Sequence, residues 1–278
     1  MEYDPIKYRL AKLLKGSHFL RRLFFLSLDL LFLRAWYVRR ELKRLKKVLK
    51  HDAKFLDAGM GFGQYSDRLL RMFPDASLVG LEIDLKHTYG SVDYFRAVHP
   101  NSQLVLGDVQ KIPLADTSFD FIITVDVMEH VDDDQATFKE YCRVLKPGGY
   151  LLMHTPRIRD DVPYEEHHHD EERTGWHVDE HVRDGYRDSE ARERMGKAGL
   201  EVVRIVRGYG KAGMVAWNLL QRIPLATLSK SKMLLSPLVA LYLIVVLPIA
   251  LIFMWLDVIR GDSPRGGSLL VVAKKVEI

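Results

Sequence analysis

The sequence predicts an α/β fold in which a mostly parallel, seven-stranded sheet is covered by helices on both faces. Short apolar runs alternate with amphipathic stretches from residue 53 onward. A glycine-rich turn follows the first apolar run, and an acidic residue ends or closely follows the second and third. Strands that alternate with helices at this spacing are typical of a parallel sheet that is buried on both faces.

The apolar runs give the seven expected strands. In chain order they are residues 53–56, 77–81, 103–106, 120–125, 150–154, 202–206 and 269–273. The helices expected among them are residues 65–72, 86–98, 134–145 and 189–198. We expect Pro147-Gly148-Gly149 to close the third of these helices and Gly199 to stop the last.

Composition and charge exclude some classes of protein and indicate a kind of partner. The 278 residues include a single cysteine, Cys142, which excludes an internal disulfide and a cysteine-rich zinc site. Residues 1–54 have a net charge of +10, whereas the rest of the chain has a net charge of −6. A basic segment on an acidic body indicates a polyanionic partner, either a phospholipid surface or a nucleic acid.

Residues 1–50 are expected to form a basic, amphipathic helical arm. Only 11 residues separate Arg22 from Arg34, and one of them is Asp29, so this segment is too short to cross a bilayer. In one arrangement residues 19–50 lie in a membrane interface, with aromatic side chains inserted and basic residues at the headgroups. In the other, the helix packs on its own domain and its basic end is solvated. The aromatic residues concerned are Phe24, Phe25, Phe32 and Trp36.

The residues with the clearest chemical role follow the first three strands. The sequence Asp57-Ala-Gly-Met-Gly-Phe-Gly63 places three glycines before a helix, where the backbone can take positive φ and a ligand can approach closely. Glu82 ends the second strand, where a Rossmann-type fold holds a ribose diol, and Asp108 follows the third strand beside the expected adenine edge. The glycine turn, Glu82 and Asp108 come at the ends of the first three strands in the expected order, and together they predict a site for a nucleotide-like ligand.

Residues 53–155 resemble the core of the class I S-adenosylmethionine-dependent methyltransferases, closest to the subgroup of ubiquinone and menaquinone biosynthesis methyltransferases. The resemblance implies a Rossmann-like methyltransferase fold with S-adenosylmethionine as cofactor. Glu82 departs from the pattern, because many relatives have Asp there, but the two carboxylates share the same acceptor chemistry. The matching segments are FLDAGMGFG (55–63), GLEID (80–84), GDVQKIP (107–113), SFDFIIT (118–124), MEHV (128–131) and RVLKPGG (143–149).

The same resemblance implies roles for individual cofactor-binding residues. A nicotinamide-binding loop is the alternative at the glycine turn, but its third glycine would come one position later, where this chain has Gln64. The implied roles are Asp57, Gly59 and Gly61 for the methionine end, Glu82 for the ribose, Asp108 and the Val109 backbone for the adenine, and Asp126 beside the methyl donor.

A methyl transfer needs a general base only when the acceptor is a hydroxyl or a carbon acid. The base candidates are His154, at the end of the fifth strand, and His181, in a polar stretch at residues 155–188 that is expected to be a lid-like loop. His130 is expected to be structural. No metal site is expected, because the three consecutive histidines at 167–169 would point to alternate faces of an extended chain.

Residues 51–278 are expected to form the methyltransferase domain, with an insertion at residues 208–267 before the last strand. Within it, residues 233–256 carry no charge and are long enough to span a bilayer. The sixth and seventh strands are neighbours in the implied fold, so both ends of the insertion should lie on one side. A re-entrant or in-plane hairpin is therefore expected. The alternatives are a buried cap or dimer interface, and a true span that leaves residues 260–278 outside the sheet.

A membrane-facing methyltransferase can take its acceptor from the bilayer. We therefore expect a lipid-like acceptor, such as an isoprenoid quinone precursor or a phospholipid, at the cytoplasmic face of a membrane contacted through residues 19–50 and 233–256. The alternatives are a soluble small-molecule acceptor in the cytoplasm and a non-catalytic, membrane-bound scaffold with the same fold. Nucleic acid is disfavoured, because residues 39–50 lack the interleaved aromatic side chains that stack on bases.

Overall fold

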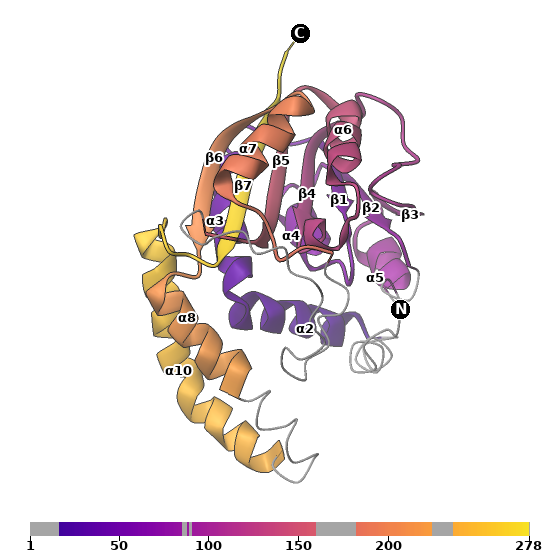
Figure 1. The fold of residues 1–278 in the computed structure, drawn as a ribbon. Coiled ribbons are helices and arrows are strands. Elements are labelled where there is room, and N and C mark those ends of the chain that lie inside the picture. Colours follow the sequence, from indigo (N-terminus) through magenta and orange to yellow (C-terminus); the bar gives the residue numbers. More distant parts are fainter. Residues whose placement is uncertain (1–16, 85–87, 89–90, 160–181, 224–235, 278) are drawn as a thin grey trace.

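Seven strands form one sheet in the computed structural model, which describes residues 17–84, 88, 91–159, 182–223 and 236–277 (Figure 1). The strand order is β3-β2-β1-β4-β5-β7-β6, and β7 runs antiparallel to both neighbours while the other pairs are parallel. The mostly parallel α/β sheet predicted from the sequence is therefore confirmed. The strands are β1 Lys54–Ala58, β2 Ser77–Glu82, β3 Ser102–Leu106, β4 Phe119–Val125, β5 Leu145–Pro156, β6 Leu200–Gly208 and β7 Ser268–Lys275.

Helices cover both faces of the sheet, and each face has its own apolar core. The helices are α3 Leu33–Leu45, α4 Gln64–Met72 and α5 Ser91–Val98 on one face, and α6 Asp134–Val144 and α7 Asp188–Lys197 on the other. Adjacent residues of β1 point into opposite cores, Phe55 into the first and Leu56 into the second, as the period of a strand requires. Burial on both faces explains why the strands are continuous apolar runs in the sequence.

The chain after α6 differs from the sequence prediction. The helix ends at Val144, and Leu145 already pairs with Phe119 of β4. Pro147-Gly148-Gly149 therefore lies inside β5, as an irregularity in the strand, and does not form a separate turn that closes the helix. Pairing with β4 overrides the local turn signal, and Gly148 accommodates the irregularity with φ +74°.

The N-terminal segment folds as two helices that pack on the domain. α2 (His18–Leu31) and α3 are separated by Phe32, whose backbone is extended. α3 buries Tyr37 and Leu42 in the core of the domain. Of the two arrangements left open for residues 19–50, α3 therefore has the one in which the helix packs on its own domain, and membrane contact through these residues stays a prediction for α2 alone.

α2 has one apolar face toward the domain and a second toward solvent. Phe25 is 2% exposed and packs edge-on against Tyr94, so it is buried and not available for insertion into a membrane. Phe24 packs against Phe62 of the glycine turn. The outer apolar side chains follow helical spacing, and they are Phe19, Leu20, Leu23, Leu26 and Leu30.

The insertion between β6 and β7 is a helical hairpin that projects from one end of the sheet (Figure 1). Gly208, the last residue of β6, and Pro156, the last residue of β5, both pair with Ser268, the first residue of β7. The hairpin therefore begins and ends at the carboxyl edge of the parallel strands. Its arms are α8 Lys211–Trp217, continued by the π-helix η2 Asn218–Arg222, and α10 Ser236–Arg260.

The second arm of the hairpin is a long apolar helix. By length and composition Leu241–Arg260 can cross a membrane, and only 17% of that window is buried. The helix continues through Pro248, so this proline does not end it. α10 packs along the first arm, where the hydroxyl of Tyr242 donates to the carbonyl of Leu219 (3.1 Å).

A buried carboxylate holds the base of the hairpin on α3. Asp257 of α10 accepts hydrogen bonds from the hydroxyl of Tyr37 (2.8 Å) and from the backbone N–H of Gly210 (3.3 Å). Arg40 of α3 donates to the backbone carbonyls of Val258 and Gly261 at the end of α10. The last turn of α10 is therefore part of the folded domain.

We predict that Gly213→Ala, in α8, lowers the free energy of unfolding, although alanine normally favours a helix over glycine. A Cβ at position 213 would lie 2.5 Å from the Asp257 carboxylate and 2.7 Å from Leu33, and such overpacking costs about 1–3 kcal/mol. Gly196→Ala in α7 is the control, because an added Cβ there meets nothing within 4 Å and should stabilise by about 0.5–1 kcal/mol. Urea unfolding measures the free energy of unfolding of each variant, with both in the same detergent. Equal changes in the two variants would contradict the close packing of the hairpin.

Candidate active site

The glycine turn between β1 and α4 has a backbone that favours glycine at three positions. Gly59, Gly61 and Gly63 have φ values of +83°, +54° and +88°. A Cβ at Gly59 would collide with Val127, and one at Gly63 with Phe95, whereas one at Gly61 would stand in open space. The face of the turn at Gly61 is therefore open to a ligand.

Glu82 ends β2 directly beside this turn. One of its carboxylate oxygens accepts the backbone N–H of Gly61 (2.8 Å), and the other accepts the backbone N–H of Ile83 (3.0 Å). The residue is buried. The carboxylate is therefore held at the open face of the turn, and its ribose-binding role stays a prediction.

Asp57 lies beneath the turn, within β1. The hydroxyl of Ser66 donates to its carboxylate at 2.6 Å. Burial raises the pKa of Asp57 to about 7, although the hydrogen bond from Ser66 opposes the shift. A cation bound above the turn would favour the ionised form of this carboxyl.

Asp108 and Val109 follow β3 at the same edge of the sheet. The register of β2 and β3 places Leu106 opposite Glu82, so Asp108 comes two residues beyond that pair. The carboxylate of Asp108 accepts the backbone N–H of Gln110 (2.8 Å), and Val109 is buried. The structure thus brings the predicted adenine-binding residues next to the predicted ribose-binding carboxylate.

A second group of side chains lies where β4 and β5 end. Asp126 follows β4 and is hydrogen-bonded to Nδ1 of His154 in β5 (2.8 Å). Asp126 also pairs with Nε of Arg34 from α3 (3.1 Å). Although burial opposes it, the charges of Arg34 and His154 hold the pKa of Asp126 below its usual value.

His154, one of the two predicted base candidates, is buried beside Asp126. Its Nε2 atom is inaccessible to solvent and has no hydrogen-bond partner among the described residues. The ring orients Asp126 in this arrangement. The other candidate, His181, lies outside the described residues, as do residues 167–169.

Sequence reasoning missed Arg34, because the contact joins α3 to the end of β4 and no local pattern marks it. Its guanidinium lies 4.4 Å from the centre of the Phe32 ring, and its backbone N–H donates to the hydroxyl of Tyr209 (3.2 Å). The side chains of Arg34 and Asp126 are 32% and 29% exposed. This ion pair is therefore partly accessible to solvent.

Backbone strain marks the same place. Among the described residues other than glycine, Thr117, Asp126 and Tyr209 have positive φ. Two of these three are the partners of Arg34. Strain of this kind costs about 1–3 kcal/mol per residue and concentrates at functional sites.

Glu129 is a further acid that the sequence analysis gave no role. It lies in the short helix η1 (Met128–His130), is 2% exposed and accepts a hydrogen bond from the hydroxyl of Thr155 (3.1 Å). Burial, reinforced by the charge of Asp126, raises the pKa of Glu129 to about 8. At neutral pH Glu129 therefore holds a proton while Asp126 is ionised. His130, in the same turn, is exposed.

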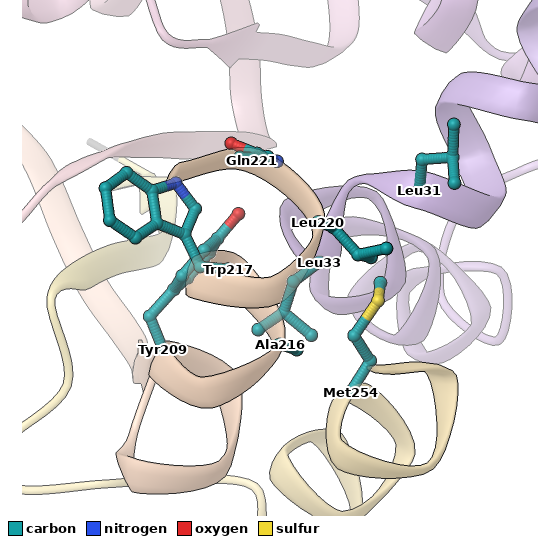
Figure 2. Close-up of a pocket in the computed structure, with 8 residues that line it drawn as sticks. All are labelled: Leu31, Leu33, Tyr209, Ala216, Trp217, Leu220, Gln221 and Met254. Carbon is teal, nitrogen blue, oxygen red and sulfur yellow. The ribbon is translucent and has the colours of Figure 1, made fainter. Parts of the chain in front are cut away.

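A small apolar pocket lies between the N-terminal helices and the hairpin (Figure 2). Tyr209 forms part of its wall and connects it to Arg34 through the hydrogen bond described above. Over the part of the chain that the structure describes, no group of three or more His, Cys, Asp or Glu side chains is placed to hold a metal ion. The pocket residues are Leu31, Leu33, Tyr209, Ala216, Trp217, Leu220, Gln221 and Met254.

Comparison with known proteins identifies the domain. Residues 56–153 match the family model described as methyltransferase domain. The chain carries a class I S-adenosylmethionine-dependent methyltransferase domain. The open turn at Gly61 and the buried carboxylates beside it fit the cofactor of this domain, S-adenosylmethionine.

Relatives of the methyltransferase domain cover only part of the chain. A malonyl-[acyl-carrier protein] O-methyltransferase of Methylococcus capsulatus is 35% identical over 106 residues, which is 37% of each chain. A fatty-acid O-methyltransferase of Mycolicibacterium smegmatis is 30% identical over 112 residues, 40% of this chain and 39% of the relative. The chain thus spans about two fifths of the length of these curated relatives.

The fold extends beyond the matched sequence. The crystal structure of a putative sarcosine dimethylglycine methyltransferase from Galdieria sulphuraria superposes with a TM-score of 0.60 at 18% identity, covering 87% of this chain and 84% of the other. This likeness confirms the Rossmann-like methyltransferase fold of the sheet and its helices.

We predict that Glu82→Ala weakens S-adenosylmethionine binding about tenfold or more, because a hydrogen bond to a charged group contributes about 1.5–3 kcal/mol. Isothermal titration measures the affinity. Asp75→Asn is the control, since Asp75 is an exposed acid in the turn before β2. Unchanged affinity in folded Glu82→Ala would contradict the ribose-binding role.

We also predict that the raised pKa of Glu129 makes the cofactor-free fold less stable as pH rises. Its carboxyl ionises near its usual value of 4.5 in the unfolded chain but at about 8 in the folded protein. Between these values only the folded state binds the proton, so the free energy of unfolding falls by up to about 1.4 kcal/mol per pH unit and levels off above the folded pKa.

Glu129→Gln cannot ionise and should remove this part of the pH dependence. Urea unfolding across neutral and mildly alkaline pH measures the slope. Glu201→Gln, at an exposed position of β6, should leave the slope as it is in the wild type. A Glu129→Gln protein with the wild-type slope would show that the carboxyl is not buried and protonated.

Proposed function

We propose that this protein transfers the methyl group of S-adenosylmethionine to a lipid-like acceptor at a membrane surface. The proposal rests on one observation: the cofactor turn and the apolar hairpin share the carboxyl edge of the sheet. The pairing of Pro156 and Gly208 with Ser268 puts the base of the hairpin at that edge. An acceptor in the membrane contacted by the hairpin would reach the methyl donor without leaving an apolar environment.

The residues of the cofactor site would position the donor. S-adenosylmethionine supplies a methyl carbon activated by its sulfonium, so the main task of the protein is orientation, which can lower a barrier by about 7–11 kcal/mol. The proposed roles are Asp57, Gly59 and Gly61 at the methionine end, Glu82 at the ribose, Asp108 and the Val109 backbone at the adenine, and Asp126, oriented by His154, beside the methyl group.

Exposed apolar side chains on α2 and α10 would contact the membrane. On α10, Ile244 is 71% exposed and Ile252 is 57% exposed. A large apolar surface of this kind indicates binding to a membrane or a partner. The exposed apolar residues of α10 are Leu241, Ile244, Val245, Ile249, Ile252, Trp255 and Ile259.

The basic residues in the last turn of α3, Lys43 and Arg44, do not join this surface. α3 runs from Arg34, at the carboxyl edge, toward Lys50, which precedes β1 at the opposite edge. We therefore limit the proposed membrane contact of the N-terminal segment to α2. Burial of apolar side chains would drive that contact, and added salt should weaken it little.

The names of the two curated relatives support an acceptor with lipid character. One is named for a malonyl group on acyl-carrier protein and the other for fatty acids. A fatty acyl compound, an isoprenoid quinone precursor or a phospholipid at the cytoplasmic face of a membrane fits the proposal.

The experiment that tests the function supplies a total lipid extract with deuterated methyl donor and analyses the products by mass spectrometry. We expect a lipid that gains a labelled methyl group, and much less labelling with Glu82→Ala when the donor concentration is below the raised Kd of the variant. Labelling of water-soluble metabolites alone would contradict the lipid-like acceptor. Donor binding without any labelled product would favour a non-catalytic scaffold.

Membrane contact makes a separate prediction. The double variant Ile244→Glu/Ile252→Glu should lose flotation with phospholipid vesicles, because each glutamate would place a charge in the apolar layer. Both positions are exposed, so the fold should persist. Val203→Glu is the control, since Val203 is 50% exposed on β6, outside the hairpin. Flotation of the double variant at the wild-type level would contradict membrane contact by α10.

A further inference from the structure

We infer that the acceptor of the proposed methyl transfer is a carboxylate at the end of an apolar chain, and that Arg34 binds this carboxylate. The inference rests on the proposed function and names the chemical group that is methylated. Three observations carry it: the position of Arg34 beside the apolar pocket, the charge balance around Asp126, and the buried state of His154.

Arg34 joins the methyl-donor side of the site to the apolar pocket. Its neighbour Leu33 and its hydrogen-bond partner Tyr209 both line that pocket, and Phe32 lies beneath its guanidinium. Figure 2 shows the side chains of Leu220 and Met254, which come from the two arms of the hairpin, and Leu33 from α3, and all three line the pocket. As it stands the pocket is too small for an acyl chain, so the helices would have to separate for an apolar tail to lie between them with its head toward Arg34.

The guanidinium has room for a second carboxylate. Among the described residues, Asp126 is the acid that pairs with Arg34, and the pairing uses Nε at 3.1 Å. The planar guanidinium has further N–H donors on its terminal nitrogens, in a geometry that matches a carboxylate. The guanidinium also interacts with the buried hydroxyl of Tyr65, and the side chain is 32% exposed, so part of the guanidinium is left for an incoming carboxylate.

The charge balance of the site favours an anionic acceptor. Asp126 is already paired with Arg34 and bonded to His154, and Glu129 holds a proton at neutral pH. An amine acceptor would end as a cation beside Arg34, with neither acid left to compensate it. A carboxylate instead complements both Arg34 and the sulfonium, and in a site of low dielectric this attraction is strong.

The reaction with a carboxylate needs no proton transfer. A lone pair on the carboxylate oxygen forms the bond to the methyl carbon while the carbon–sulfur bond breaks and its electron pair stays on sulfur. The products are a methyl ester and S-adenosylhomocysteine. A carboxylate is ionised at neutral pH, so no base is required. This agrees with the buried Nε2 of His154, which acts as a positioning residue through Asp126.

The first test identifies the methylated group. Phosphatidylcholine vesicles containing hexadecanoic acid, hexadecan-1-ol or hexadecylamine are incubated with the full-length protein and tritiated methyl donor. We expect label in the acid alone. In parallel, a labelled total lipid extract is treated with mild alkali, which releases methanol from a methyl ester but not from an ether, an amine or a carbon-bound methyl.

The outcomes separate this inference from the proposed function. Label in the alcohol or the amine, or alkali-stable label in the extract, overturns the carboxylate and leaves the lipid-like acceptor standing. Alkali-labile label in the extract supports the carboxylate even if hexadecanoic acid itself is a poor substrate. An absence of labelled lipid despite donor binding overturns both.

The second test addresses Arg34 itself. Arg34→Gln should raise the KM for the carboxylic acid about tenfold or more, the loss expected when a charge-assisted hydrogen bond is removed, while the Kd for the donor changes much less. Arg34→Lys keeps the charge and should recover part of the loss. Arg39→Gln, an exposed position of the same helix, is the control and should behave as the wild type. If the donor Kd rises as much as the acceptor KM, Arg34 organises the cofactor site and does not bind the acceptor.

Discussion

The direction of β7 is the constraint on which the rest of the molecule depends. Because β7 runs antiparallel between β5 and β6, the chain that precedes it must begin and end at the carboxyl edge of the parallel strands. Open α/β sheets bind their ligands at this edge. The strand topology alone therefore places an apolar insertion between β6 and β7 beside the cofactor turn. The same insertion between two parallel strands would have had to cross from one edge to the other.

The N-terminal helices complete the site from the same edge. α2 is joined to α4 through Asp29, which accepts from Gln64 (2.7 Å) and pairs with Arg68, and to α5 through the hydrogen bond from Arg21 to Ser91 (3.0 Å). α3 supplies Arg34 to Asp126. The side of the site at which we place the methyl donor is thus bordered by a segment whose outer face is apolar. A membrane in contact with that face would therefore touch α2, whose Phe24 packs against Phe62 of the glycine turn.

The sequence predicted those parts of the site that local patterns encode. The glycine turn and Asp108 follow strands and Glu82 ends one, so order and spacing were enough to predict them as site residues. Arg34 and Tyr209 were not predicted as site residues, because their contact depends on how α3 and the end of β6 pack together. The sequence left the role of α3 open for a physical reason: an apolar stripe has the same period whether it faces lipid or protein. Pro147-Gly148-Gly149 shows the converse, since strand pairing overrode a strong local turn signal.

The lengths and anchors of the hairpin bear on how it meets a membrane. Its first arm, from Lys211 to Arg222, reaches roughly 18 Å at the rise of an α-helix, whereas the hydrocarbon core is about 30 Å thick. At the other end, Asp257 and Arg40 hold the last turn of α10 on α3, so this turn stays with the domain. A full crossing by Leu241–Arg260 would need that last turn inside the hydrocarbon or on its far side. For the proposed membrane contact, this geometry therefore favours a hairpin that enters one leaflet over a helix that crosses the bilayer.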